Sequence, residues 1–158
     1  MTNNDVLRRL RFILDYNDET MMKTFKNVKM DVSREVLSNW LKKDDDPDYK
    51  AIKDVELASF LDGLIIDKRG KKEGQDPFPE SVLTNNIIFR KIKIALNLTT
   101  DDILNILDLV DLRVSKAELG AFFRKPTHKN YRECKDQILR NFLSGLQKVP
   151  SELADDQN

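Results

Sequence analysis

The sequence Phe-Leu-Asp-Gly-Leu at residues 60–64 returns as Phe-Leu-Ser-Gly-Leu at residues 142–146, 82 positions further along the chain. The same shift aligns residues 2–67 with residues 84–149 without a gap, and 18 of the 66 aligned pairs are identical. Self-similarity over this length indicates a tandem duplication, in which each copy is one structural unit. Each element of the sequence can therefore be interpreted twice.

The borders of the copies follow from the composition of the segment between them. The sequence KRGKKEGQDPFPES, residues 68–81, contains two glycines and two prolines, which is typical of a linker. Two copies are too few for an open solenoid, so we expect one compact body with pseudo-two-fold symmetry. The division that we predict is a first helical repeat at residues 1–67, a linker at 68–83, a second helical repeat at 84–148 and a flexible tail at 149–158.

Apolar residues recur in each copy at the spacing of an amphipathic helix, and no stretch sustains the alternation of a strand. The clearest stripe runs from Leu57 to Leu64, and the second copy repeats it. We expect an Asn to cap the first helix of each copy, and Ser33 and Ser115 to cap the third. Ser115 and Glu118 also have the spacing of a capping box. The sequence predicts an all-α protein with four helices in each copy.

A glycine stands at the same place in both copies, at positions 63 and 145, within a helical pattern. Glycine in a helix interior costs about 1 kcal/mol relative to alanine, so its retention needs a reason. For Gly145 we expect the end of a helix, because Pro150 follows soon afterwards. For Gly63 we expect the close approach of another helix, with the fourth helices of the two copies, or of two chains, crossing there.

Bulk features favour a soluble, cytoplasmic protein. No run approaches the roughly 18 consecutive apolar residues of a membrane span, so we expect no membrane contact. The N-terminal sequence is charged every few residues and has no apolar signal core. The only cysteine, Cys134, leaves no intramolecular disulfide, as expected in a reducing compartment.

The formal net charge is zero, but the two copies differ. Residues 1–67 hold 11 Lys and Arg against 14 Asp and Glu, whereas residues 84–148 hold 12 against 7, so a nucleic acid would prefer the second copy. The first helix carries a basic cluster in both copies: Arg8, Arg9 and Arg11, then Arg90, Lys91 and Lys93. Such a cluster can contact phosphates. We favour the alternative, a solvated face whose aliphatic stems cover apolar neighbours.

The third helix of the first copy, VSREVLSNWLKK at residues 32–43, is similar to the recognition helix of a lambda-repressor type helix-turn-helix. Such a helix needs an N-cap, an apolar back and outward polar residues that reach base edges. The expected back consists of Val36, Leu37, Trp40 and Leu41, with Trp40 and its counterpart Phe122 largely buried beside Leu119 and Phe123. The candidate contacts of the two third helices are Arg34, Asn39, Lys116 and Arg124.

Two observations make DNA binding the alternative rather than the first hypothesis. Asn27 and Asp31 stand where the lambda type prefers a small Ala and a Gly. The outward face of the second copy, residues 116–124, offers no Asn or Gln to read a base.

No pattern predicts catalysis, a metal or a cofactor. His128 and Cys134 are six residues apart, and nearby Lys and Arg would lower the pKa of a thiol, but no oxyanion donor accompanies them. A lone cysteine is more often a small apolar residue. The acidic run at residues 44–48 lacks the glycine and closing Glu of a calcium loop, so we interpret it as a solvated turn. We retain His128, Tyr131 and Arg132 only as a candidate interaction surface.

Three segments, TNNIIFRKIKIAL, LTTDDILNIL and FRKPTHKNYRECKDQILRNFLSGL, resemble the YehS-like family of bacterial proteins, which contain two tandem copies of a domain of unknown function. The resemblance runs from Thr2 to about Gln147. It implies the duplicated organisation and brings no activity. We therefore expect a non-enzymatic binding or regulatory module that contacts a protein partner or itself, and keep nucleic-acid binding as the alternative.

Overall fold

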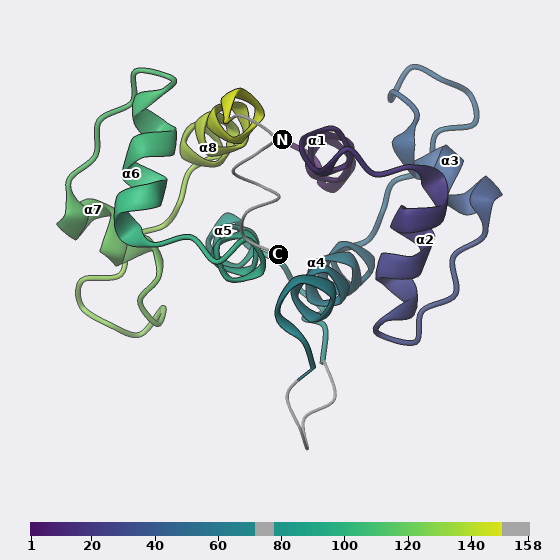
Figure 1. The fold of residues 1–158 in the computed structure, drawn as a ribbon, viewed down its shortest axis with the longest axis horizontal. Coiled ribbons are helices and arrows are strands. Elements are labelled where there is room, and N and C mark those ends of the chain that lie inside the picture. The colour runs from purple at the N-terminus through teal and green to yellow at the C-terminus, as the bar shows by residue number, and fades with distance from the viewer. Residues whose placement is uncertain (72–77, 150–158) are drawn as a thin grey trace. The chain divides into compact units, whose positions relative to one another are not determined.

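The computed structural model describes residues 1–71 and 78–149, and in these ranges it contains eight α-helices and no strand (Figure 1). The chain divides into two compact units, unit 1 at Met1–Leu83 and unit 2 at Thr84–Asn158. Each unit holds four helices, so the predicted all-α class and the two similar four-helix units are confirmed. The pseudo-two-fold packing of the units stays a prediction.

The helices of the two units correspond one to one. Those of unit 1 are α1 (Asn3–Leu14), α2 (Asp18–Lys26), α3 (Arg34–Leu41) and α4 (Asp54–Arg69). Those of unit 2 are α5 (Asn85–Ala95), α6 (Thr100–Asp108), α7 (Lys116–Phe122) and α8 (Asp136–Lys148). None of these helices is long and apolar enough to cross a bilayer. Of the predicted linker and tail, residues 72–77 and 150–158 lie outside the described residues.

Side-chain caps start the first three helices of each unit. Ser33 and Ser115 accept hydrogen bonds from backbone N–H groups three residues later, as predicted, and Ser115 forms the expected capping box with Glu118. The expectation of an Asn cap on the first helix was wrong. Thr2 and Thr84 cap α1 and α5, which leaves the asparagines that follow them free for another role.

An aromatic core fills each unit. In unit 1 the ring of Phe25 lies 5.6 Å from that of Trp40 and 5.3 Å from that of Phe60, measured between ring centroids. Trp40 and its counterpart Phe122 are each only 4% exposed, which confirms their predicted burial. Leu37 and Leu119 are buried beside them, and Leu41 and Phe123 are half-buried. Val36 is 41% exposed, so its predicted place on the apolar back of the third helix was wrong.

The two retained glycines are contact points between helices of the same unit. A Cβ atom on Gly63 would lie 1.9 Å from the carbonyl oxygen of Thr24 in α2, and one on Gly145 would lie 2.4 Å from that of Ile106 in α6. The close approach predicted for Gly63 is confirmed, but α2 makes it and not another fourth helix. Gly145 lies inside α8 rather than at a helix end, so that expectation was wrong.

Candidate functional site

Buried asparagines position the long loop between the third and fourth helices. Asn4, in the first turn of α1, is 2% exposed. Its Nδ2 donates to the carbonyl oxygens of Trp40 at 2.9 Å and Lys50 at 2.8 Å, and its Oδ1 accepts from the N–H of Ile52 at 3.1 Å. One side chain thus satisfies three backbone groups, two of which belong to the loop at residues 42–53. We call this set of bonds the asparagine anchor.

Unit 2 repeats the asparagine anchor bond for bond. Asn86 donates to the carbonyl oxygens of Phe122 at 3.0 Å and Arg132 at 2.8 Å, and accepts from the N–H of Cys134 at 2.9 Å. The loop at residues 124–135 is therefore held on the same course as its counterpart. Sequence reasoning missed this role, although the retention of Thr-Asn-Asn at the start of both copies was a signal for it.

A surface pocket of about 220 Å³ lies between the anchored loop of unit 1 and the start of α1. Its lining residues are Thr2, Asp5, Arg8, Lys43, Asp44 and Tyr49. The pocket therefore brings two cations and two carboxylates together with two hydroxyl groups.

Inside this pocket, Arg8 is already engaged. Its guanidinium forms an ion pair with Asp5 and donates to the carbonyl oxygen of Lys42 at 2.6 Å. Burial alone would raise the pKa of Asp5, but hydrogen bonds from Thr2 and the charge of Arg8 lower it below its ordinary value. Asp5 is therefore ionised at neutral pH and neutralises Arg8.

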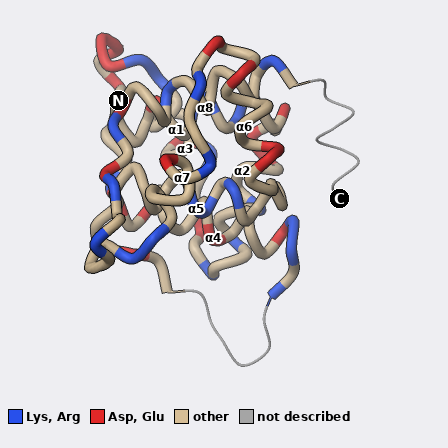
Figure 2. Tube along the Cα trace, turned by 90° about the vertical axis from the view of Figure 1, so that its left-hand side faces the viewer, with Lys and Arg blue, Asp and Glu red and all other residues tan. Residues whose placement is uncertain are grey.

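The other basic residues of the first helices do not form one open cationic face. Arg11 pairs with Asp18 at 2.8 Å. In unit 2, Lys91 is 9% exposed, and the Lys93 ammonium lies 5.5 Å from the centroid of the Phe123 ring. Arg9 is half-buried, and Arg90 is exposed. Figure 2 shows acidic and basic residues interspersed along the trace, in line with this local pairing.

The candidate readers of the third helices are largely held by neighbouring side chains. Arg34 lies 3.3 Å from a carboxylate oxygen of Asp18, and Asn39 accepts from the Lys42 ammonium at 3.2 Å. Lys116 lies 3.4 Å from Asp101, while Arg124 is exposed.

The spacing of the helices also differs from a helix-turn-helix. The segment from 27 to 33 separates α2 from α3, which is longer than the three- or four-residue turn of that motif.

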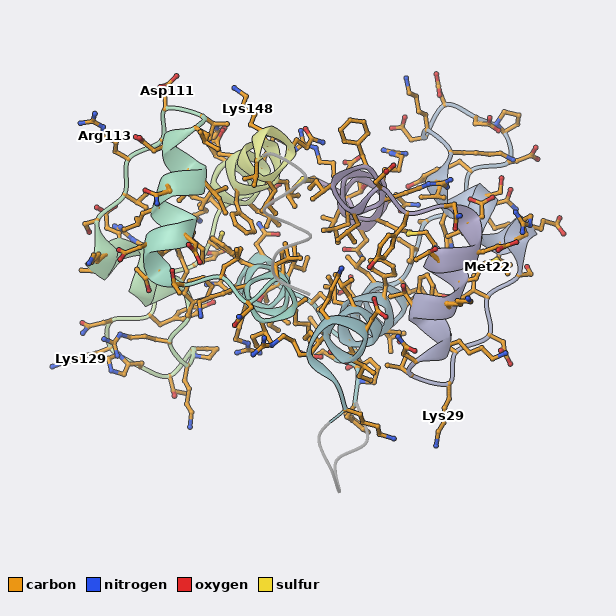
Figure 3. All side chains as sticks on the ribbon, in the orientation of Figure 1. Met22, Lys29, Asp111, Arg113, Lys129 and Lys148 are labelled. Carbon is orange, nitrogen blue, oxygen red and sulfur yellow. The ribbon has the colours of Figure 1, made fainter. Side chains whose placement is uncertain are left out.

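The residues around Cys134 lack the geometry of a nucleophile pair. Cys134 is 1% exposed, and burial raises the pKa of its thiol to about 12, the opposite of what a reactive thiolate requires. His128 is exposed, and its Nδ1 accepts from the N–H of Asn130 at 3.0 Å. Lys129 points out of the loop, away from the helices (Figure 3).

The other two residues of the candidate interaction surface differ in their exposure to solvent. Tyr131 is half-buried, and Arg132 is exposed, 3.8 Å from Glu118. Among the described residues, no three His, Cys, Asp or Glu side chains gather as a metal site would require.

One exposed apolar position recurs in both units, and sequence reasoning did not single it out. Phe12 on α1 is 73% exposed, and its counterpart on α5, Ile94, is 43% exposed. In each unit two basic residues precede this apolar residue, one by four positions and one by three. In unit 1 they are Arg8 and Arg9. Residues at this spacing share a helix face. Each first helix therefore presents an apolar side chain next to cations.

Comparisons with known proteins agree with the duplicated organisation. Residues 3–70 and residues 85–149 each match the family described as "Protein of unknown function (DUF1456)". The chain is 44% identical over 147 residues to "Uncharacterized protein YehS" of Escherichia coli (strain K12), and the match covers 92% of this chain and 94% of that relative. No solved structure matches the chain. The resemblance inferred from the sequence is confirmed.

Proposed function

Because this chain belongs to the family described as "Protein of unknown function (DUF1456)", a name that states no activity, we propose from its own residues that it is a non-enzymatic module that binds another protein. The observation that carries the proposal is the exposed apolar residue kept at one helical position in both units, Phe12 and Ile94. A cytoplasmic location remains part of the proposal.

The residues around Phe12 have the composition of an interface anchor. Aromatic residues and Arg are enriched where protein partners bind, because each combines a large contact area with few rotatable bonds or with several hydrogen-bond donors. Phe12 supplies the apolar area, and Arg8 and Arg9 lie on the same face of α1. An isolated exposed apolar residue needs no explanation. The recurrence of an exposed apolar residue at Ile94, again beside cations, does need an explanation.

Nucleic-acid binding is the second candidate. It is favoured by the positive balance of residues 84–148 and by the exposure of Arg90 and Arg124. Against it, Arg11, Arg34 and Lys116 lie in ion pairs with acids of their own unit, so phosphate contacts there would first have to displace a carboxylate.

A pull-down from bacterial lysate with the full chain as bait separates the two candidates. We expect a protein to be retained equally with and without nuclease, and to be lost with Phe12→Ala or Ile94→Ala. Val36→Ala is the matched control, because Val36 is about as exposed as Ile94 but lies on the third helix. Retention that disappears after nuclease treatment would support the second candidate. Retention unaffected by Phe12→Ala and Ile94→Ala would contradict the proposed surface.

A further inference from the structure

The residues that line the pocket of unit 1 have counterparts at the equivalent positions of unit 2, and two of these counterparts differ in type. Four of the six lining residues are identical at the equivalent positions: Thr84, Arg90, Lys125 and Tyr131. The two that differ replace acids, with Ile87 in place of Asp5 and Pro126 in place of Asp44. Unit 2 therefore keeps both cations and both hydroxyl groups of the set and has neither carboxylate.

The loops that carry these residues follow the same course in both units. The N–H of His128 donates to the carbonyl oxygen of Lys125 at 2.8 Å, and the N–H of Tyr131 donates to that of His128 at 3.0 Å. In unit 1 the corresponding distances, in the turns that begin at Lys43 and end at Tyr49, are 3.0 and 3.1 Å. Together with the asparagine anchor, these turns set Lys125 and Tyr131 at the backbone positions of Lys43 and Tyr49.

In unit 1 the carboxylate of Asp5 acts as a built-in anion of the pocket. It pairs with Arg8, and it accepts a hydrogen bond from the backbone N–H of Thr2 at 3.0 Å. Ile87 offers no acceptor at the equivalent place in unit 2, and the first turn of α5 contains no acid. Arg90 is exposed, and neither it nor Lys125 forms an ion pair with another described residue. Arg90 is retained in unit 2, and the carboxylate that neutralises its counterpart Arg8 in unit 1 is missing.

We propose that unit 2 binds an oxyanion, a phosphate or carboxylate group of an external ligand, which pairs with Arg90 as the Asp5 carboxylate pairs with Arg8 in unit 1. Arg90 pairs with two of its oxygens, and Lys125 and the hydroxyl groups of Thr84 and Tyr131 complete the site. The planar guanidinium matches the geometry of either group. Two cations that form no ion pair with another described residue favour the higher charge of phosphate. Arg90 also lies beside Ile94 in the protein-binding proposal. The two proposals are still separable, because a phosphate titration can fail while the protein pull-down succeeds, and the reverse.

Nuclear magnetic resonance of the full-length protein tests the site residue by residue. We would titrate ¹⁵N-labelled protein with inorganic phosphate, and separately with acetate, against chloride at matched ionic strength. We expect saturable shifts of backbone amide signals at residues 84–90 and 125–131, larger with phosphate, and no comparable response at residues 2–8. A stronger response to acetate would assign the site to carboxylate ligands.

Exchange of one residue between the units supplies matched variants. Ile87→Asp gives unit 2 the built-in anion and should abolish the phosphate response, while the rest of the spectrum stays that of a folded protein. Asp5→Ile should create the response in unit 1. Arg90→Gln should weaken phosphate binding about tenfold or more, because hydrogen bonds to charged groups are the strong ones.

Three results would overturn the proposal. The first is a phosphate and acetate response no larger than that of chloride. The second is an equal response of both units in the unaltered protein. The third is binding that survives both Ile87→Asp and Arg90→Gln. Arg90 is exposed, so its replacement tests the site even if Ile87→Asp disturbs α5.

Discussion

The side-chain amide of Asn4 donates a 2.9 Å hydrogen bond to the carbonyl oxygen of Trp40, which joins the first turn of α1 to the last turn of α3. The partner groups of this amide are backbone atoms, so the contact depends on the course of the chain and not on which side chains surround it. This explains how Asn4 and Asn86 make the same bonds although Trp40 is replaced by Phe122 and Ile52 by Cys134.

Replacing Asn4 should therefore destabilise unit 1 strongly. Asn4→Ala leaves up to three backbone groups without their partner, and each buried group left unpaired costs about 1–3 kcal/mol. Because water reaches part of the loop, we expect a loss of about 3 kcal/mol in the free energy of unfolding. The chain contains one tryptophan, and Trp40 lies in the core of unit 1, so its fluorescence during denaturant unfolding reports on this unit.

A matched control for this variant is Asn105→Ala. Asn105 is an exposed residue inside α6, where alanine is the better helix former. It should be neutral or slightly stabilising by circular dichroism. An Asn4→Ala protein as stable as the unaltered chain would show that the asparagine anchor does not hold the loop.

The glycines give a second prediction. Replacement by alanine should lower the stability of the protein at the two helix contacts and raise it at a glycine that makes no such contact. Gly63→Ala and Gly145→Ala should each destabilise by about 1–3 kcal/mol, because the added methyl group meets a backbone carbonyl that cannot move aside alone. Gly120→Ala should instead stabilise by up to about 1 kcal/mol, since it lies in α7 with open space around the added atom. Chemical denaturation of the three variants checks the contrast, and a stabilised Gly63→Ala would refute the close contact with α2.

The duplication made most of the fold predictable. Two aligned copies distinguish retained apolar positions from incidental ones, and this was enough to assign eight helices and to bury Trp40 and Phe122. Contacts between helices were harder to assign. Gly63 and Gly145 were each given a different reason, although both meet the second helix of their own unit. A residue pattern shows that a side chain must be small and does not identify the neighbour that requires it.

Little of the candidate site followed from the sequence. Arg8 and Arg90 were expected from their charge, but the pocket beside Arg8 arises from a loop whose course depends on the buried Asn4. An asparagine before a helical pattern is usually interpreted as a cap, because capping is a local interaction and the anchor joins residues 36 to 48 positions apart. The exposed Phe12 was missed because apolar residues on a helix are expected to face the core.

The indole of Trp40 should make the largest single contribution to the core of unit 1. Trp40 is 4% exposed and packs against Phe25, so Trp40→Ala should cost roughly 3–5 kcal/mol. Circular dichroism replaces fluorescence as the measurement, because the variant lacks the only tryptophan. The exposed Val36, on the same helix, serves as the control and should change stability by less than about 1 kcal/mol on truncation.

The thiol of Cys134 should be protected by folding and should couple stability to high pH. Burial raises the pKa of Cys134 from 9.0 to about 12, so the folded state favours the neutral thiol. The resulting stabilisation is fully present below pH 9 and is lost as the pH rises towards 12, because the unfolded chain releases its proton first. At pH 8, iodoacetamide should alkylate the folded protein far more slowly than the denatured protein. Between pH 9 and 12, the unaltered chain should lose more stability than Cys134→Ala, which has no thiol to titrate. Rapid alkylation of the folded chain at pH 8 would show that the thiol is open to solvent.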